Sequence, residues 1–513
     1  MMTVFAKTFA ALLLVALSSV TDPATAKNHL GSTEFFAGEA QIASQPPLPI
    51  HLTLRHSGTA IGGTIATPVG EFEIRAKAQG SSILGQFEGP GGTGPISLTI
   101  NADQLSGSFT LGELQGTIAA QRTTLDAQAF FLPPKENLKL TTAEWLEDLE
   151  RLIEILTEEH ASPFHRISRE TFESEVAQIR AAIAGHQGPA IVMEFRKLAA
   201  LIGDGHTEVA LQQEQPLLPV RFFWFEDGLR VVGASTEYQH LLGFRLVAVD
   251  AVDVETAIER LRPFIPAGET EGFVRAAMVD LLRNPDALAA AGIVDRPSVD
   301  LTVEADDGHR KTLEMKASSD PRRWIMHNGG APLWSRNQDQ GFWTQALADG
   351  SIYVNWRSYG KLSEHTAALL KDLEARRPRR LIVDLRDNNG GDYNVGRAFI
   401  EEIRKRVWLN KPGALYVLIG RTTFSAAMTN AIDFRKMTHA VLVGEPAGAA
   451  PNNWQEVRRF HLPNSGLQVG VSTVYYSFLP GEASVRPDLN VPPERRDWGA
   501  DQDAAVRAIL SQP

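Results

Sequence analysis

The chain has 513 residues, of which 43% are hydrophobic and 22% charged, so it is too long for one ordinary core and apolar enough to fold. A net charge of -11, from 61 acidic and 50 basic residues, gives no electrostatic basis for binding nucleic acid or an anionic membrane. The absence of cysteine excludes disulfides, thiolate nucleophiles and cysteine-ligated metal centres.

Residues 1–26 have the composition of a secretory signal peptide. Lys7 precedes an apolar run over residues 9–17, and Ala24-Thr25-Ala26 forms a small-residue cleavage site. The apolar run is much shorter than the roughly 20 residues that a membrane span requires. We therefore expect cleavage after Ala26, export to the periplasm or secretion, and no membrane span in the mature chain.

Residues 30–122 alternate between apolar and polar side chains in short runs, as half-buried strands do. Ile50, Leu52 and Leu54 show the pattern, and glycines recur between the runs, where tight turns need them. We expect an accessory antiparallel β-domain, folded as a small barrel or sandwich. It contains no catalytic constellation.

Residues 138–212 have helical patterning. Thr141 and Glu144 have the spacing of a capping box at a helix start, and the third helix ends near Gly203. This region is predicted to be a helical cap that delivers the loop Gly203-Asp204-Gly205-His206-Thr207.

Between residues 217 and 315 the pattern changes to strands. A turn over residues 226–228 separates two of them, and a helix is predicted over residues 254–261. An open sheet edge beside a helix can accept an extended peptide as an added strand. This order predicts a peptide-binding module.

From residue 335 to 513, strands alternate with helices. The strand over 381–385, the helix over 395–404 and the strand over 415–419 are examples. Such alternation is typical of an α/β domain with a parallel sheet, whose functional site lies at the carboxyl ends of the strands.

Three features converge on that edge of the sheet. Ser425 follows a buried strand and opens a helix, whose first amides can bind developing negative charge. Gly390 and Gly391 follow another strand and let the backbone approach a ligand closely. His206 could take the serine proton, because serine needs a base near neutral pH. Taken singly, each feature also fits an ordinary helix cap, tight turn or structural histidine.

Four motifs in this order resemble the tail-specific, or C-terminal processing, serine peptidase family, particularly its branch similar to the tricorn core and the interphotoreceptor retinoid-binding protein. The motifs are Gly203-Asp204-Gly205-His206-Thr207, Asp384-Leu385-Arg386-x-Asn388-x-Gly390-Gly391, Thr423-Phe424-Ser425-Ala426-Ala427 and Gly444-Glu445-Pro446-Ala447-Gly448. The resemblance covers about residues 140–495. It implies a crotonase-like α/β catalytic core and a PDZ-like domain over residues 217–315.

By this resemblance Ser425 is the nucleophile. The amide of Ala426 is one oxyanion donor, and the amide of Gly391 is the second, with Gly390 as the alternative.

The base and its supporting carboxylate depart from the family pattern. Where the processing proteases have a lysine, this chain has Ala450, so the resemblance to the tricorn-like branch implies His206 as base. That branch also has a serine before the histidine, where this chain has Gly205. Its supporting glutamate corresponds to Glu482, which lies one position out of register with Pro487-Asp488.

The sequence thus predicts an exported serine endopeptidase that acts on peptides or unfolded proteins through an acyl-enzyme on Ser425, with His206 as general base. The alternatives are a non-catalytic ligand- or peptide-binding protein on the same frame, and a hydrolase of small esters. No metal-ligand motif or phosphate-binding loop occurs, so no metal or cofactor is expected. The sequence leaves the oligomeric state open.

Overall fold

The structure is a computed structural model, and its contacts divide the chain into two compact units, Met1–Pro134 and Lys135–Pro513, which are described separately. It describes residues 32–42, 47–67, 70–89, 92–112, 114–127, 134–213, 215–296, 298–318, 325–326, 330–498 and 503–512. The predicted signal peptide lies outside these residues.

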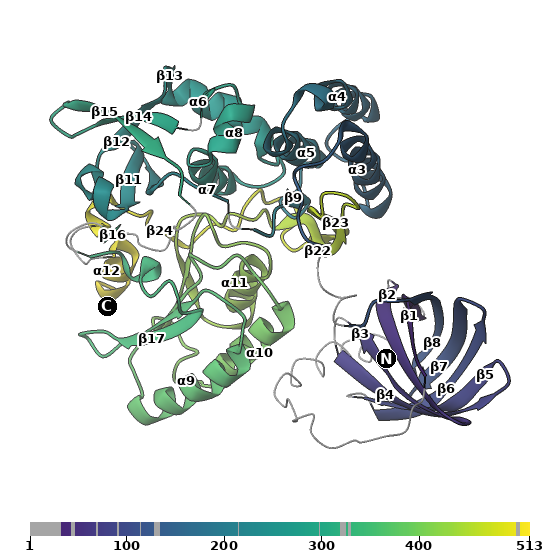
Figure 1. The fold of residues 1–513 in the computed structure, drawn as a ribbon. Coiled ribbons are helices and arrows are strands. Elements are labelled where there is room, and N and C mark those ends of the chain that lie inside the picture. Colours follow the sequence, from purple (N-terminus) through teal and green to yellow (C-terminus); the bar gives the residue numbers. More distant parts are fainter. Residues whose placement is uncertain are drawn as a thin grey trace. The chain divides into compact units, whose positions relative to one another are not determined.

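Eight antiparallel strands form a closed barrel in the first unit, because β1 pairs with both β2 and β8 (Figure 1). The strands are β1 (Thr33–Ile42), β2 (Leu48–Ser57), β3 (Ala60–Thr67), β4 (Gly70–Gln79), β5 (Ser82–Gly89), β6 (Gly92–Asn101), β7 (Gln104–Leu111) and β8 (Leu114–Thr123). Apolar residues from all eight strands fill the interior, including Ile50, Leu52 and Leu54. The predicted antiparallel β fold is confirmed, and it is a barrel.

The second unit begins with three helices, α3 (Thr142–Glu154), α4 (Arg169–Ala182) and α5 (Gly188–Ile202), with a π-helical turn η1 (Ile155–Glu159) after the first. The capping box at Thr141 and Glu144 is confirmed. α5 ends at Gly203, whose φ of 90° stops the helix and starts the His206 loop.

A hairpin from far along the chain completes the helical region. β22 (Asn452–His461) pairs with β23 (Gln468–Ser477), and β23 pairs with β9 (Glu208–Ala210), which directly follows the His206 loop. Side chains of the hairpin and of the three helices share one buried apolar cluster. The loop that carries His206 is therefore anchored on one side by α5 and on the other by this hairpin.

The next region is an antiparallel sheet with helices packed against it. Its strands are β10 (Val220–Phe225), β11 (Gly228–Ala234), β12 (Arg245–Val249), β13 (Val252–Asp253), β14 (Ser298–Glu304), β15 (Arg310–Lys316) and β16 (Ile325–Met326), and its helices are α6 (Val254–Leu261), α7 (Glu271–Leu281) and α8 (Pro285–Ala290). Sheet and helices share a second buried cluster. α7 matters for the site because its N-terminus lies beside the loop that carries the candidate nucleophile.

The last region is a six-stranded sheet in the order β17 (Phe342–Ala346), β18 (Ile352–Trp356), β19 (Leu381–Asp384), β20 (Leu415–Ile419), β21 (Val441–Gly444) and β24 (Leu489–Asn490). β17 is antiparallel to β18, and every other neighbouring pair is parallel. This confirms the predicted α/β architecture, with an antiparallel strand added at one edge.

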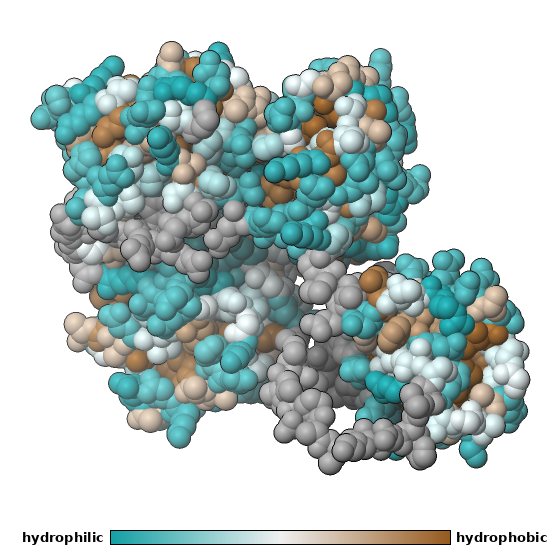
Figure 2. Space-filling model, in the orientation of Figure 1, coloured by the Kyte–Doolittle hydropathy of each residue, from teal (hydrophilic) through white to brown (hydrophobic). Residues whose placement is uncertain are grey.

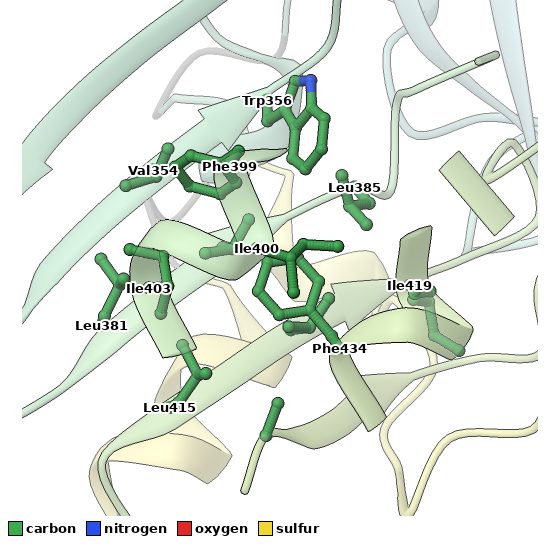
Figure 3. Packing of buried hydrophobic residues seen from close by; sticks show 14 of the residues in the cluster. Val354, Trp356, Leu381, Leu385, Phe399, Ile400, Ile403, Leu415, Ile419 and Phe434 are labelled. Atoms are coloured by element: carbon green, nitrogen blue, oxygen red, sulfur yellow. The ribbon is translucent and has the colours of Figure 1, made fainter. Parts of the chain in front are cut away.

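Helices cover both faces of this sheet. α9 (Leu362–Arg376), α10 (Tyr393–Arg404) and α11 (Ala426–Met437) bury one face, where Phe399, Ile400, Ile403 and Phe434 pack against alternate strand residues (Figure 3). The intervening strand residues pack on the opposite face against α12 (Ala504–Leu510). Burial on both faces explains why these strands are almost wholly apolar in sequence.

Short 3₁₀ turns connect these elements at η2 (Ile183–Gly185), η3 (Thr236–Leu241), η4 (Arg262–Phe264), η5 (Leu333–Ser335) and η6 (Arg495–Asp497). On the face drawn in Figure 2, hydrophilic residues predominate and hydrophobic ones form limited patches among them. Within the described residues, no helix combines the length and the apolar composition needed to cross a membrane.

Candidate active site

Ser425 occupies the junction between β20 and α11, at the carboxyl edge of the parallel sheet. Its backbone has φ 50° and ψ -128°, a conformation that costs a side-chain-bearing residue about 1–3 kcal/mol. The preceding turn holds it there, since the Thr423 hydroxyl accepts the Gly420 amide at 2.9 Å and donates to the Leu385 carbonyl at 2.7 Å. The Ser425 hydroxyl caps no helix amide and remains half-buried.

The loop after β19 packs directly on Ser425. A Cβ atom added to Gly390 would lie 2.6 Å from Ser425 Cβ and 3.0 Å from the Ala426 nitrogen, and Gly390 has a φ of 103°. Only glycine fits both the space and the backbone conformation. A further bond, from the Phe424 amide to the Asn388 carbonyl at 3.0 Å, joins the two loops.

The backbone amides beside Ser425 differ in whether they already donate a hydrogen bond. The Gly390 amide donates to Asn388 Oδ1 at 2.9 Å. The amides of Gly391 and Ala426 have no acceptor among the described residues. Two backbone donors near Ser425 are therefore unoccupied, and the amide of Gly390 is already bonded.

His206 lies against the residue next to the candidate nucleophile. Its ring centroid is 4.6 Å from that of Phe424. Both ring nitrogens are buried, and no hydrogen bond joins the ring to Ser425. Burial lowers the pKa of His206 below its usual value, although the negative charge of Asp204 and the backbone of Trp454 oppose the change.

Asp204 fixes the backbone of the His206 loop. Its Oδ1 accepts the amides of His206 at 3.0 Å and Thr207 at 2.9 Å, and the Ser472 hydroxyl at 2.6 Å. Its Oδ2 accepts His160 Nε2 at 3.0 Å. Burial raises the pKa of Asp204, but the hydrogen bonds from His160, Ser472 and Thr207 outweigh it and hold the pKa below the ordinary value.

Glu482 and Ala450 complete the set of residues named from the sequence. The Glu482 side chain is exposed, and the described residues offer its carboxylate no hydrogen-bond or ion-pair partner. Its role as the supporting carboxylate stays a prediction. Ala450, at the place of the family lysine, donates its backbone amide to a carboxylate that sequence reasoning missed.

That carboxylate belongs to Glu269, in the loop before α7. Its Oε2 accepts the Ala450 amide at 2.7 Å and its Oε1 accepts the Gly205 amide at 3.1 Å. Burial raises the pKa of Glu269 to about 7, and the hydrogen bonds from Ala450 and Gly205 reduce the rise. No motif marked it, since the surrounding sequence is typical of a polar loop leading into a helix.

Arg421 connects the nucleophile loop to the segment after β21, through an ion pair, and to β10 of the antiparallel sheet, through a hydrogen bond. The Arg421 guanidinium makes two bonds to Glu445, at 2.7 and 2.8 Å, and donates to the Trp224 carbonyl at 2.7 Å. It also lies 4.2 Å from the centroid of the Phe223 ring. Arg421 therefore fixes one end of the loop that carries Ser425.

A pocket of about 770 Å³ opens beside this ion pair. Its lining includes Glu269, Thr270, Arg275, Arg421, Glu445 and Ser484. Within the described residues, no group of three or more histidine, cysteine, aspartate or glutamate side chains is placed to hold a metal ion.

Comparison with known proteins gives the fold a class. Neither protein-family models nor curated protein sequences match this chain. Among solved structures, mature CPAF matches at 13% identity and a TM-score of 0.51, over 72% of this chain and 96% of that chain. Mature CPAF complexed with lactacystin matches at 12% identity and a TM-score of 0.52, over 72% and 97%. This chain therefore has the CPAF fold.

A further match is the photosystem II D1 C-terminal processing protease, at 13% identity and a TM-score of 0.36, over 71% of this chain and 99% of that chain.

Proposed function

We propose that this chain is an exported serine endopeptidase of the tail-specific family, acting on peptides or unfolded proteins through Ser425. The observation that carries the proposal is the backbone of Ser425, held at a positive φ between a close-packed glycine and the N-terminus of α11. This backbone conformation costs free energy in any residue that has a side chain, and such strained residues cluster at functional sites.

In the proposed reaction His206 takes the Ser425 proton and the serine oxygen attacks the peptide carbonyl. The amides of Ala426 and Gly391 then stabilise the tetrahedral oxyanion, since neither has another acceptor. His206 next donates its proton to the leaving amine, and water, with His206 again as base, releases the acyl group. The lowered pKa of His206 keeps the ring neutral, and so able to accept a proton, at neutral pH.

His206 must approach Ser425 for this chemistry, because the two side chains are not hydrogen-bonded in the structure. The ring already contacts Phe424, the residue before the serine. Catalytic hydrogen bonds often tighten only when substrate binds. We infer that substrate binding closes the remaining gap.

The other regions have supporting roles in this proposal. Residues 217–315 are proposed as a PDZ-like module that binds substrate by strand addition, and residues 138–212 as a helical cap over the site. Residues 1–26 are proposed as a signal peptide, which N-terminal sequencing of the mature protein would test by finding Lys27 first.

Labelling by a serine-directed fluorophosphonate, followed by peptide mapping, tests the function. We expect Ser425 to be labelled, and Ser425→Ala to lower peptide hydrolysis by about 10⁴-fold or more. Ser511→Ala, which alters an exposed serine on the last turn of the chain, should leave both unchanged. Full hydrolysis by Ser425→Ala would contradict the proposal. Absence of labelling would favour a binding protein, and cleavage of esters without peptides would favour an esterase.

A further inference from the structure

Glu269 connects two loops that meet beside the candidate nucleophile. One contains Gly205, the neighbour of His206, and the other contains Ala450. The next residue strengthens the connection, because the Thr270 hydroxyl donates to the carbonyls of Ala447 and Gly448 at 3.0 and 2.7 Å. The loop before α7 is therefore bonded once to the histidine loop and at several points to residues 447–450.

The space around Glu269 leaves little freedom for the His206 loop. A Cβ atom at Gly205 would lie 2.8 Å from Glu269 Cγ and 2.8 Å from Phe424 Cζ. Gly205 is thus enclosed between the Glu269 side chain and the residue preceding Ser425. A displacement of Glu269 would shift Gly205 and, with it, His206.

We propose that Glu269 is a positioning residue whose carboxylate, bonded to the amides of Gly205 and Ala450, sets the place of His206 relative to Ser425. This inference rests on the proposed peptidase function. Both carboxylate oxygens accept a backbone amide, so the ionised form suits the arrangement better than the protonated form, in which one oxygen carries a proton. In a chain without the family lysine, this carboxylate joins the loop at Ala450 to the histidine loop.

Several charged groups lie on the elements packed around Glu269. They are Asp204 and His206 on the loop after α5, Arg166 beside Gly268, Glu271 and Arg275 on α7, and Arg421, Glu445 and Arg486 around the adjoining pocket. Burial is nevertheless the largest effect on the pKa of Glu269, and the charge of Asp204 adds to it.

The expected pH dependence follows from the two shifted groups. With a pKa of about 7, Glu269 is ionised above neutrality and becomes protonated as the pH falls through that value. The pKa of His206 is below its usual value, so His206 protonates only at lower pH. Reactivity of Ser425 should therefore begin to decline near pH 7, before the base itself is protonated.

The test measures the second-order rate constant of fluorophosphonate labelling at Ser425 from pH 5 to pH 9. In Glu269→Gln one of the two accepting oxygens becomes an NH₂ group, which cannot accept the backbone amide bonded at that position. We therefore expect labelling at pH 8 to fall about 10- to 100-fold. The decline near pH 7 should disappear, leaving only the decline due to His206 at lower pH. Glu259→Gln, at an exposed site on α6, should keep the wild-type rate and profile.

A second variant guards against a folding defect. Glu269→Asp keeps an ionisable carboxyl but is one methylene shorter. Its Ser425 should be labelled more slowly than in the wild type at pH 8, and the labelling rate should still decline as that carboxyl is protonated. A wild-type rate in either variant, or a decline that stays near pH 7 in Glu269→Gln, would overturn the inference. A wild-type protein that is not labelled at Ser425 would instead refute the proposed function.

Discussion

Gly390 determines how closely the loop after β19 can approach Ser425. Its Cα carries no side chain at a point where a Cβ atom would meet Ser425 Cβ at 2.6 Å. Contacts this short do not occur between real Cβ atoms, so any larger residue must displace the serine or the loop. The glycine therefore has two functions, to allow a φ of 103° and to permit the contact.

We predict that Gly390→Ala slows fluorophosphonate labelling of Ser425 by about 100-fold, because displacements near 1 Å in a reacting group have effects of that size. The variant should also lose about 2–4 kcal/mol of unfolding free energy, from backbone strain and the clash together. Labelling kinetics and thermal denaturation measure the two effects.

Gly413→Ala separates strain from contact. Gly413 has a φ of 76°, but nothing lies within 4 Å of the position its Cβ would take. The Gly413→Ala variant should therefore lose about 1 kcal/mol of unfolding free energy, and its Ser425 should be labelled at the wild-type rate. Equal labelling rates in the two alanine variants would show that the packing of Gly390 on Ser425 has no bearing on the nucleophile.

Asp204 joins three elements, since it bonds His160 after η1, the His206 loop and Ser472 of β23. Asp204→Asn replaces one accepting oxygen with an NH₂ group, which cannot accept the bonds made there. We predict a loss of about 2–3 kcal/mol of unfolding free energy at pH 7, the usual size for bonds to a charged group. Slower labelling of Ser425 should accompany it.

The effect of Asp204→Asn should depend on pH. Because the folded protein lowers the pKa of Asp204, its stabilisation is present above the unfolded pKa and is lost as the pH falls through the folded value. The difference in melting temperature between wild type and variant should therefore narrow from pH 7 to pH 3. A constant difference would contradict this account. Asp339→Asn, at an exposed aspartate with no partner among the described residues, should show neither effect.

Elements defined by local patterns could be predicted from the sequence. Alternating apolar residues such as Ile50 and Leu52 indicated the strands of the barrel, and the spacing of Thr141 and Glu144 indicated the start of α3. The pairing of β9 with β23 could not be predicted, because it joins residues 208–210 to residues 468–470 and depends on the packing of the whole unit.

The candidate site likewise contains residues that could be predicted from the sequence and one that could not. Ser425 and the glycines after β19 follow strands of one parallel sheet, and the carboxyl ends of such strands meet at one edge. Glu269 lies 64 positions from Gly205 and 181 from Ala450. Its neighbours in sequence are polar and carry no periodic signal, so only tertiary packing reveals that its carboxylate is buried against the histidine loop.

At the scale of the whole molecule, the chain contains two units with separate cores. The barrel is filled by its own apolar residues and has no free strand edge, because β1 closes on β8. The candidate site residues named here all lie within Lys135–Pro513. Units with independent cores can unfold independently and tolerate separation.

We predict that residues 135–513, produced without the barrel, fold and are labelled at Ser425 within about twofold of the full-chain rate, since every side chain that fixes the serine, the histidine loop and Glu269 belongs to that unit. Calorimetry of the full chain should show two transitions, one of which is absent from the truncated protein. The isolated barrel, residues 32–134, provides the matching control and should show only the transition that the truncation removes. A single transition in the full chain, together with loss of labelling after truncation, would mean that the barrel is needed to fold the site.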